Sequence, residues 1–392
     1  MTSIFSYIKS YFSSFKQPHY IRVNNPNNIY IRTKRLRSWT IIKWITLITI
    51  VGILCFFILY DVQLNIHVYL RKWISQADDV YNKPLHGCFN NLHEDSPYRT
   101  GKQDYNYDIT PNTGLLLNDI TCYDFASSIQ PLPKVKREDM IYHTYWRADH
   151  APVGSKQLAT LRSFFATQHT KTSRVYLWSN SDISESPVIR EIKKQVGDRL
   201  QLLIYDPKSL SKGSPMEDSS YFDATDVSEY YLDGNLIQLL ALYKYGGLWF
   251  DMDSLFIRDM TPLFEREWLV QWDCLLPDGF PFNGAFMHFR KQSPYLCEML
   301  TEMAKGFLPH DNTMDWGNYL YYRIYRRLLQ NGVRPFSILP WCFVDSLACA
   351  PSIPKTDFSK DRLLGTFAYR WKKGPDHLFN FLENRHKNVT GW

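Results

Sequence analysis

The first 60 residues of this 392-residue chain contain no aspartate or glutamate, although they carry eight lysines and arginines. Taking those eight from the chain's 45 basic residues leaves 37 basic against 39 acidic residues, so the remaining body has a net charge of −2. A nearly neutral body lacks the basic surface that nucleic-acid binding requires, and no nucleic acid is expected as a partner. The chain also lacks internal repeats and heptads, which argues against solenoids and coiled coils. Gly-x-Gly-x-x-Gly, phosphate-loop, His-Glu-x-x-His and Gly-x-Ser-x-Gly signatures are absent too, which argues against the enzyme classes built on them.

One long apolar run is present near the N-terminus. Residues 44–60 carry no charge, and extending the run back to Trp39 admits a single lysine. At about 1.5 Å per residue, such a helix crosses the hydrocarbon core of a bilayer. The flanking basic residues all precede the run, and Asp61 is the first acidic residue of the chain. The positive-inside rule therefore predicts an uncleaved, single-pass type II anchor at 39–60, with the large C-terminal body in the lumen.

Cysteine usage fits a lumenal body. Six of the seven cysteines follow the apolar run, in a compartment where disulfides form. Their connectivity cannot be derived from the sequence; the shortest plausible loop, between Cys342 and Cys349, stays an open pairing. One N-glycosylation sequon, at Asn388, lies on the same side and close to the C-terminus.

The sequence after the anchor divides into two parts that differ in composition and in hydrophobic periodicity. After a basic cytosolic tail at 1–38 and the anchor, residues 61–138 are rich in Asn, Asp, Tyr and Pro and show little periodicity, which predicts a lumenal stem. Within 139–392, apolar strand patterns at 140–146, 174–178 and 201–205 alternate with helical patterns at 158–166 and 188–195. This alternation predicts an α/β fold, with a mainly parallel sheet flanked by helices.

The stretch 233–253 combines a helix, two glycines, a strand and an acidic pair. Apolar residues recur at i, i+3, i+4 and i+7, which predicts an amphipathic helix. We expect Asp233 to cap this helix and Gly246-Gly247 to end it, because glycine adopts positive φ at little steric cost. Residues 248–250 then form a short buried strand that ends at the acidic pair.

The acidic pair, Asp251 and Asp253, has a spacing with chemical meaning. Alternate side chains of an extended backbone point the same way, so the two carboxylates should project together, away from Met252. Like charges at a strand end need a compensating cation. Hard oxygen ligands suit Mn²⁺ or Mg²⁺, and a diphosphate can complete the coordination shell. The carboxyl ends of parallel strands are also where α/β sheets bind ligands.

Here the sequence resembles a known family. The block YKYGGLWFDMDSLFIRDM looks like the D-x-D region of glycosyltransferase family 32, which includes fungal Golgi α-mannosyltransferases and α-1,4-galactosyltransferases. Stretches such as IYHTYWRAD, LATLRSFFATQ, VQWDC, FNGAFMHF and SPYLCEM extend the similarity over about residues 139–350.

The resemblance implies a GT-A-like fold and transfer of a hexose, mannose or galactose, with retention of anomeric configuration. It implies a divalent cation and a nucleotide-sugar donor, GDP-mannose or UDP-galactose. It further implies a glycan or glycolipid acceptor, a Golgi membrane location and complexes with other Golgi glycosyltransferases.

Several residues match the family's motif by position. Asp251 and Asp253 correspond to its D-x-D, and Gly247 is one of the glycines before it. His143 and Trp146 lie in the segment matching the strand that borders the nucleotide site. Trp146 either stacks on a base or belongs to the core.

The chain also departs from the family pattern. Asn235 and Gln238 stand where members carry an Asp and an Arg that contact the donor, and Asp233 either compensates or only caps the helix. Near the C-terminus, members carry a metal-proximal His close to a Trp; here Tyr369 takes that place, and His377 is a distant candidate.

Three further polar residues follow the acidic pair. Asp273 and Asn283 are expected sugar or acceptor contacts, the alternative being turn chemistry, because Asn-Gly and Pro-Asp-Gly are strong turn formers. Asp315 either caps a helix running through 319–329 or faces the acceptor.

Two other functions compete with transfer. An apolar strand followed by D-x-D also describes haloacid-dehalogenase-like phosphatases, but that fold expects a second acidic pair, and no Asp-Asp or Glu-Asp pair follows Asp253. The substitutions at Asn235, Gln238 and Tyr369 suit a lumenal sugar-binding or accessory protein that keeps the fold with little or no activity.

Overall fold

The computed structural model describes the backbone of residues 29–60, 83–90, 92–93, 96–98, 122–130, 139–223, 230–271, 282–306, 315–344, 360–372 and 376–392. Side chains are described within these ranges except at 29–38, 122, 223 and 230–233. The chain forms two compact units, Met1–Leu70 and Arg71–Trp392.

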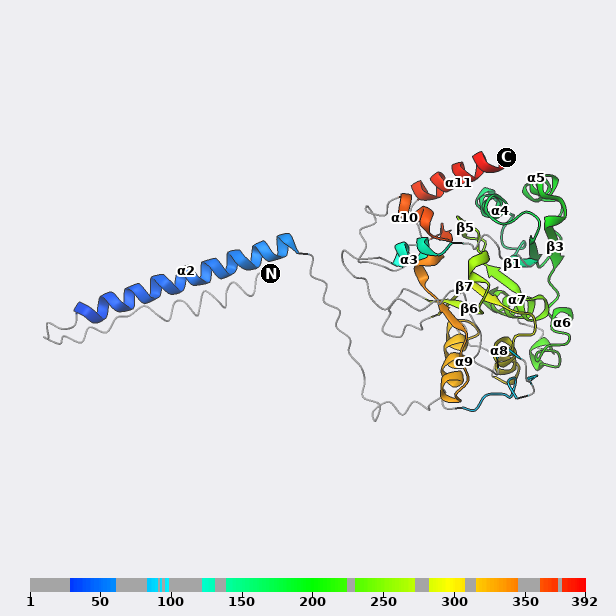
Figure 1. Cartoon of the computed structure of the whole chain (residues 1–392), viewed down its shortest axis with the longest axis horizontal. Helices are drawn as coiled ribbons and strands as arrows, with labels where there is room; N and C mark the ends of the chain where they lie inside the picture. The colour runs from blue at the N-terminus through cyan, green and yellow to red at the C-terminus, as the bar shows by residue number, and fades with distance from the viewer. Residues whose placement is uncertain are drawn as a thin grey trace. The chain divides into compact units, whose positions relative to one another are not determined.

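The described residues of the N-terminal unit, 29–60, contain the long helix α2 (Ile29–Leu59) (Figure 1). Its segment Trp39–Leu59 has a mean hydropathy of 2.5, and none of it is buried. The predicted apolar helix is thus confirmed, and its length and composition are those of a helix that can cross a membrane.

The second unit is built on a seven-stranded sheet in the order β3-β2-β1-β4-β7-β6-β8. The strands are β1 (Met140–Trp146), β2 (Ser173–Ser179), β3 (Leu200–Ile204), β4 (Gly247–Phe250), β6 (Trp268–Gln271), β7 (Phe282–Phe289) and β8 (Ser337–Leu339). The β1–β2, β2–β3, β1–β4 and β6–β8 pairs are parallel, whereas β7 runs antiparallel to β4 and β6. The predicted mixed, mainly parallel sheet is confirmed.

Helices cover both faces of this sheet (Figure 1). One face carries α3 (Cys122–Ser128), α4 (Ser155–Thr167), α5 (Pro187–Val196), α10 (Lys360–Gly365) and α11 (Asp376–Thr390). The other carries α6 (Pro207–Leu210), α7 (Tyr230–Tyr245), α8 (Pro294–Lys305) and α9 (Asn318–Gln330). The helices of each face pack on the sheet to form a hydrophobic core, called the first core on the α4 face and the second core on the α7 face. Because side chains alternate along a strand, Leu248 and Phe250 of β4 lie in the first core and Trp249 lies in the second.

Short 3-10 turns complete the backbone, η3 (Gly197–Arg199), η4 (Ser220–Asp223), η5 (Thr261–Leu263) and η6 (Trp341–Phe343). A two-stranded antiparallel sheet, β5 (Ser254–Phe256) with β9 (Ala368–Arg370), lies next to the acidic pair in sequence. Ser254 is paired with Arg370, so the C-terminal strand runs directly beside the segment that follows Asp253.

The junction between α7 and β4 depends on its two glycines. Gly246 (φ +71°) ends the helix, and Gly247 (φ +113°) lies so close to β1 that an added Cβ would stand 2.1 Å from the Ile141 carbonyl oxygen. The predicted capping role of Asp233 is wrong, because α7 begins at Tyr230 and Asp233 lies inside its first turn.

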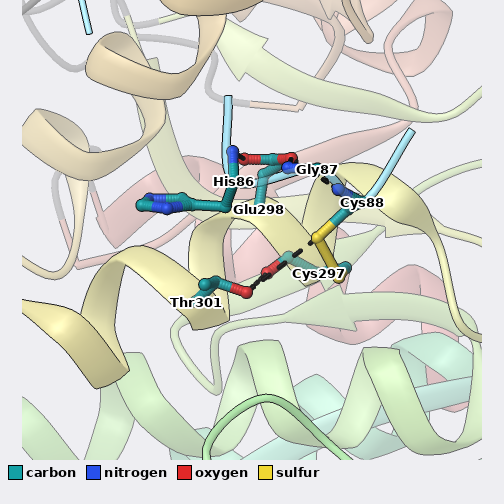
Figure 2. The surroundings of a disulfide bond; sticks show 6 residues. All are labelled: His86, Gly87, Cys88, Cys297, Glu298 and Thr301. Atoms are coloured by element: carbon teal, nitrogen blue, oxygen red, sulfur yellow. Dashed lines mark hydrogen bonds between the residues drawn. A yellow bond between two sulfur atoms is a disulfide. The ribbon is translucent and has the colours of Figure 1, made fainter. Parts of the chain in front are cut away.

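Part of the range expected to be a stem packs onto the folded body. Cys88 forms a disulfide with Cys297 of α8, and Glu298 accepts hydrogen bonds from the backbone N–H groups of His86, Gly87 and Cys88 (Figure 2). Helix α3 packs against α10 and η6 and contributes Tyr123 and Ala126 to the first core. The folded body therefore includes chain on the N-terminal side of residue 139.

One further disulfide involves Cys342. Its suggested partner, Cys349, lies outside the described residues, so that pairing stays a prediction. Asn388, the sequon asparagine, lies exposed in the last turn of α11.

Candidate active site

A cavity of about 630 Å³ opens at the carboxyl ends of β1 and β4. Helices α7 and α9 and strands β7 and β9 also contribute to its wall. The lining residues central to the site are Asn235, Gln238, Asp251, Asp253, Tyr321 and Arg370. The cavity thus lies at the edge of the sheet where the sequence predicted a ligand site.

The backbone of the acidic pair is held on three sides. The Asp251 N–H donates to the Ala285 carbonyl at 3.0 Å, and the Asp253 carbonyl accepts from the Trp371 N–H at 2.9 Å. Between them, the Met252 carbonyl accepts from the Thr160 hydroxyl at 3.0 Å. Residues 252–253 form a turn instead of the expected extended strand, yet Met252 is buried in the first core and both aspartates line the cavity. These contacts fix the direction of both carboxylates.

The two carboxylates converge on the guanidinium of Arg370. Its Nη2 lies 2.8 Å from Asp253 Oδ2 and 3.4 Å from Asp251 Oδ2, and its Nε lies 3.1 Å from Asp253 Oδ1. The Trp249 indole N–H adds a donor to Asp251 Oδ1 at 3.1 Å. Asp253 is mostly buried (12% exposed), whereas Asp251 is more open (40% exposed). The compensating cation that the sequence required is therefore supplied, in this structure, by a side chain.

The oxygen atoms of this pair are of the kind that a hard divalent cation prefers. Two carboxylates that already share one cation fit Mg²⁺ or Mn²⁺, which use one or two protein carboxylates together with phosphate oxygens. Within the described part of the chain, no third His, Cys, Asp or Glu joins them as a ligand group. Any such ion would thus depend on a bound ligand for further oxygens.

A polar cluster lies beside Asp251. Gln238 Nε2 contacts the Tyr321 hydroxyl and lies 3.5 Å from Asn235 Oδ1. Tyr321 is fully buried, and burial, together with the charge of Asp251, raises its pKa, so its hydroxyl stays protonated. The absence of a side chain at Gly284 makes room for this contact, because a Cβ there would lie 3.0 Å from the Tyr321 oxygen. Asn235 and Gln238 thus line the cavity as neutral hydrogen-bonding groups, and Tyr321 is a member that the sequence reasoning missed.

Asn283 reaches the cavity from the beginning of β7. Its Oδ1 accepts the backbone N–H of Ala285 at 3.0 Å within this strand, and the residue also lines the cavity. The expected turn at Asn283 is therefore wrong, and its contact with a sugar or acceptor stays a prediction.

The outer rim contains aromatic and basic side chains. Trp146 lines the cavity, packs partly on the first core and donates its indole N–H to the Ala151 carbonyl at 2.8 Å. Trp371 also lines the cavity and donates its indole N–H to the Thr160 hydroxyl at 3.2 Å. Arg147 and Lys372 also line the cavity, and Arg147 forms an ion pair with Asp149 at 3.0 Å.

Comparison with known proteins adds limited information. No family model matches the chain. An uncharacterized protein of Arabidopsis thaliana is 40% identical over 67 residues, which is 17% of this chain and 10% of that protein's length. So short a match does not show a family.

Several solved glycosyltransferases resemble the structure weakly. The PaToxG glycosyltransferase is 13% identical, with 69% of this chain and 83% of that chain covered and a TM-score of 0.36. GlyE of Streptococcus pneumoniae is 10% identical (64% and 62% covered, TM-score 0.40), and mouse xyloside xylosyltransferase 1 is 13% identical (60% and 98% covered, TM-score 0.39). At these scores the likenesses say nothing about function, which must be inferred from the site itself.

Two residues expected at the nucleotide site lie elsewhere. His143 is fully buried; its Nε2–H donates to the Gly246 carbonyl at 2.9 Å, and its Nδ1 accepts the Trp178 indole N–H at 3.2 Å. Burial lowers the pKa of His143 to about 4, so the ring is neutral and braces the α7–β4 junction. Gly247 belongs to the same junction and does not line the cavity. For both residues, the expected contact with the donor is corrected to a structural role.

The C-terminal expectation is also corrected. Tyr369 is fully buried in the first core, and its neighbour Arg370 faces the acidic pair, because alternate residues of β9 point to opposite sides. His377 is exposed at the start of α11 and does not line the cavity.

Three further sequence candidates are Asp233, Asp273 and Asp315. Asp315 is not among the lining residues, and α9 begins at Asn318 after Gly317, without a side-chain cap. Asp273 lies outside the described residues, and so does the side chain of Asp233.

Proposed function

We propose that the chain is a glycosyltransferase that takes a sugar from a nucleoside diphosphate and transfers it to an acceptor hydroxyl. One observation carries this proposal: two carboxylates at the end of a parallel strand converge on a single cation at the wall of a cavity of about 630 Å³. This arrangement suits the binding of a diphosphate through a divalent ion, and the volume is in the range of small-ligand sites.

Asp251 and Asp253 are the residues that would hold Mn²⁺ or Mg²⁺. When bound, the ion would stabilise the charge that develops on the departing diphosphate. The chain itself orients the pair through the Trp249 N–H and the backbone bonds of residues 251–253. Asn235, Gln238 and Tyr321 offer hydrogen bonds to sugar or ribose hydroxyls, and Trp146 and Trp371 offer flat faces to a base or sugar ring.

The resemblance to glycosyltransferase family 32 supports the finer part of the proposal. It favours a hexose donor, GDP-mannose or UDP-galactose, retention of configuration, and a glycan or glycolipid acceptor, to which Asp273, Asn283 and Asp315 are proposed contacts. The apolar helix and the charges before it favour a single-pass type II protein of the Golgi membrane that assembles with other transferases.

A non-catalytic sugar-binding protein is the second candidate. The ion pairs of Arg370 with Asp251 and Asp253 favour this second candidate, because the guanidinium then occupies the position that a metal ion would take. The two candidates differ in turnover but not in binding.

The test is turnover by the full chain in detergent, with Mn²⁺ and UDP-galactose, UDP-glucose or GDP-mannose. We expect hydrolysis or transfer with one donor, and a loss of at least about 100-fold in Asp251→Asn and Asp253→Asn, the size of effect expected for charge-stabilising groups. Asp198→Asn, an exposed aspartate away from the cavity, is the matched control and should keep full activity. Binding of a donor without turnover would favour the accessory role.

A further inference from the structure

The guanidinium of Arg370 lies at the point where the two carboxylates meet, and the role inferred for it rests on the proposed transfer function. Its Nη2 is within 3.4 Å of one oxygen of each aspartate. An ion coordinated by the same two oxygens, at about 2.1 Å from each, would overlap this nitrogen. Arg370 and a divalent ion therefore compete for one position.

The backbone of Arg370 is fixed, so only its side chain can leave. Strand β9 pairs with β5 at Ser254, and the Trp371 N–H donates to the Asp253 carbonyl. A change of side-chain rotamer is enough to move the guanidinium, with no rearrangement of the fold.

The charges at the site favour replacement of the Arg370 guanidinium by a divalent ion when a diphosphate binds at the same time. Two carboxylates and one guanidinium leave a net charge of −1, which repels phosphate. A divalent ion in place of the guanidinium would neutralise the carboxylates and release one positive group at a wall that already holds Arg147 and Lys372. A released guanidinium is a bidentate donor suited to phosphate oxygens.

The pair also lacks a third protein ligand among the described residues, so an ion would need phosphate oxygens to fill its shell. We propose that Arg370 is a built-in counter-cation that closes the carboxylate pair in the absence of ligand and yields it only when a divalent ion and a nucleoside diphosphate arrive together. Arg370 is thus a positioning residue that makes metal binding conditional on the diphosphate.

The test is Mn²⁺ binding to the full chain in detergent, measured by electron paramagnetic resonance of the free ion. Without nucleotide, Arg370→Gln should bind Mn²⁺ about tenfold or more tightly than wild type, because coupling between close charges is commonly of that size. UDP or GDP should raise Mn²⁺ affinity more in wild type than in Arg370→Gln, since the released guanidinium assists only in wild type.

Two variants serve as controls. Arg147→Gln removes a rim arginine whose Nε bonds Asp149 instead of the acidic pair, and should leave Mn²⁺ affinity unchanged. Arg370→Lys keeps the positive charge and should stay close to wild type, which separates the effect of charge from that of changing the side chain. If the glutamine variant fails to fold, titration of wild type with UDP or GDP, in Mn²⁺ and in chelator, still tests the idea.

Two results would overturn the inference while leaving the proposed function intact. One is equal Mn²⁺ affinity in wild type, Arg370→Gln and Arg370→Lys. The other is equally tight binding of UDP or GDP to wild type with Mn²⁺ and with chelator, since Arg370 would then replace the metal instead of yielding to it. If Mn²⁺ binds to no variant even with nucleotide, the proposed function fails as well.

Discussion

At the scale of single residues, the site depends on neutral hydrogen-bonding groups next to one acidic pair. Tyr321 is fully buried, contacts Gln238 and lies close enough to Asp251 for the carboxylate's charge to raise its pKa. Its hydroxyl therefore acts as a donor and acceptor and not as a base. It is placed to set the orientation of the Gln238 amide toward a ligand.

Tyr321→Phe should raise the KM for the nucleotide sugar about tenfold, because it leaves a buried amide without one partner, a cost of about 1–2 kcal/mol. Tyr295→Phe is the matched control: it loses a hydrogen bond to the Arg334 carbonyl, but the residue does not line the cavity, so KM should not change. Steady-state kinetics of both variants make the comparison, and equal KM values for the two would contradict the assigned role.

Residue-level prediction succeeded where the signal was local. The D-x-D spacing indicated two carboxylates on one side of a strand end, and both line the cavity. Arg370 and Tyr321 were missed because their positions depend on β9 and α9, which lie some 70 to 120 residues further along the chain. A sequence pattern could identify Tyr369 or Arg370 as candidates, but only the register of β9 shows which one faces the carboxylates.

At the scale of elements, the junction between α7 and β4 sets the position of the site. Gly247 combines a positive φ with a close approach to the Ile141 carbonyl, and the buried His143 donates to the Gly246 carbonyl from β1. These contacts hold β4 beside β1, so that Asp251 follows at the sheet edge.

Gly247→Ala should therefore prevent folding or lower stability by more than about 4 kcal/mol, because a Cβ cannot stand 2.1 Å from a carbonyl oxygen and strain at φ +113° adds to the clash. Gly213→Ala separates the two causes, since Gly213 also has a positive φ (+76°) but has nothing within 4 Å of its Cβ; it should cost only about 1 kcal/mol. Thermal unfolding of both variants tests this, and similar losses would refute the steric explanation.

Element-level prediction placed β1, β2, β3, α4, α5 and α7 from their apolar residues. The amphipathic character expected for α7 is wrong, because residues 236–242 are buried on every side of the helix. Prediction also failed for the segments between residues 61 and 138 that pack on the body. Residues 86–88 are held by a disulfide and by Glu298, and α3 is held by contacts with α10 and η6, partners more than 200 residues away. A local sequence pattern cannot predict contacts with partners so far along the chain.

At the scale of the whole molecule, three buried histidines make stability depend on pH. Burial lowers the pKa of His143, His288 and His386 to about 4, against 6.5 when unfolded. Between these values the unfolded chain binds more protons than the folded one, so stability is complete above pH 6.5 and is lost as the pH falls toward 4. Glu267, whose pKa burial raises, acts in the opposite direction but is a single group.

The midpoint of thermal unfolding should accordingly fall steadily between pH 6.5 and 4.5, with each histidine contributing roughly 3 kcal/mol at most. Glu302 does not contribute to the change between pH 6.5 and 4.5. Burial opposes its ionisation, but hydrogen bonds from Arg327 and His86 lower its pKa to about 2. Its contribution to stability is therefore lost mainly below pH 4.5. A midpoint that stays constant down to pH 4.5 would contradict the buried, neutral state of the three rings.

The central claim is that the cavity binds a nucleoside diphosphate through Asp251 and Asp253. Isothermal titration of the full chain in detergent with UDP and with GDP, in the presence of Mn²⁺, measures this directly. We predict that wild type binds at least one of the two and that Asp253→Asn weakens this binding by about 100-fold. Failure of wild type to bind either nucleotide, or equal binding by Asp253→Asn, would contradict the claim.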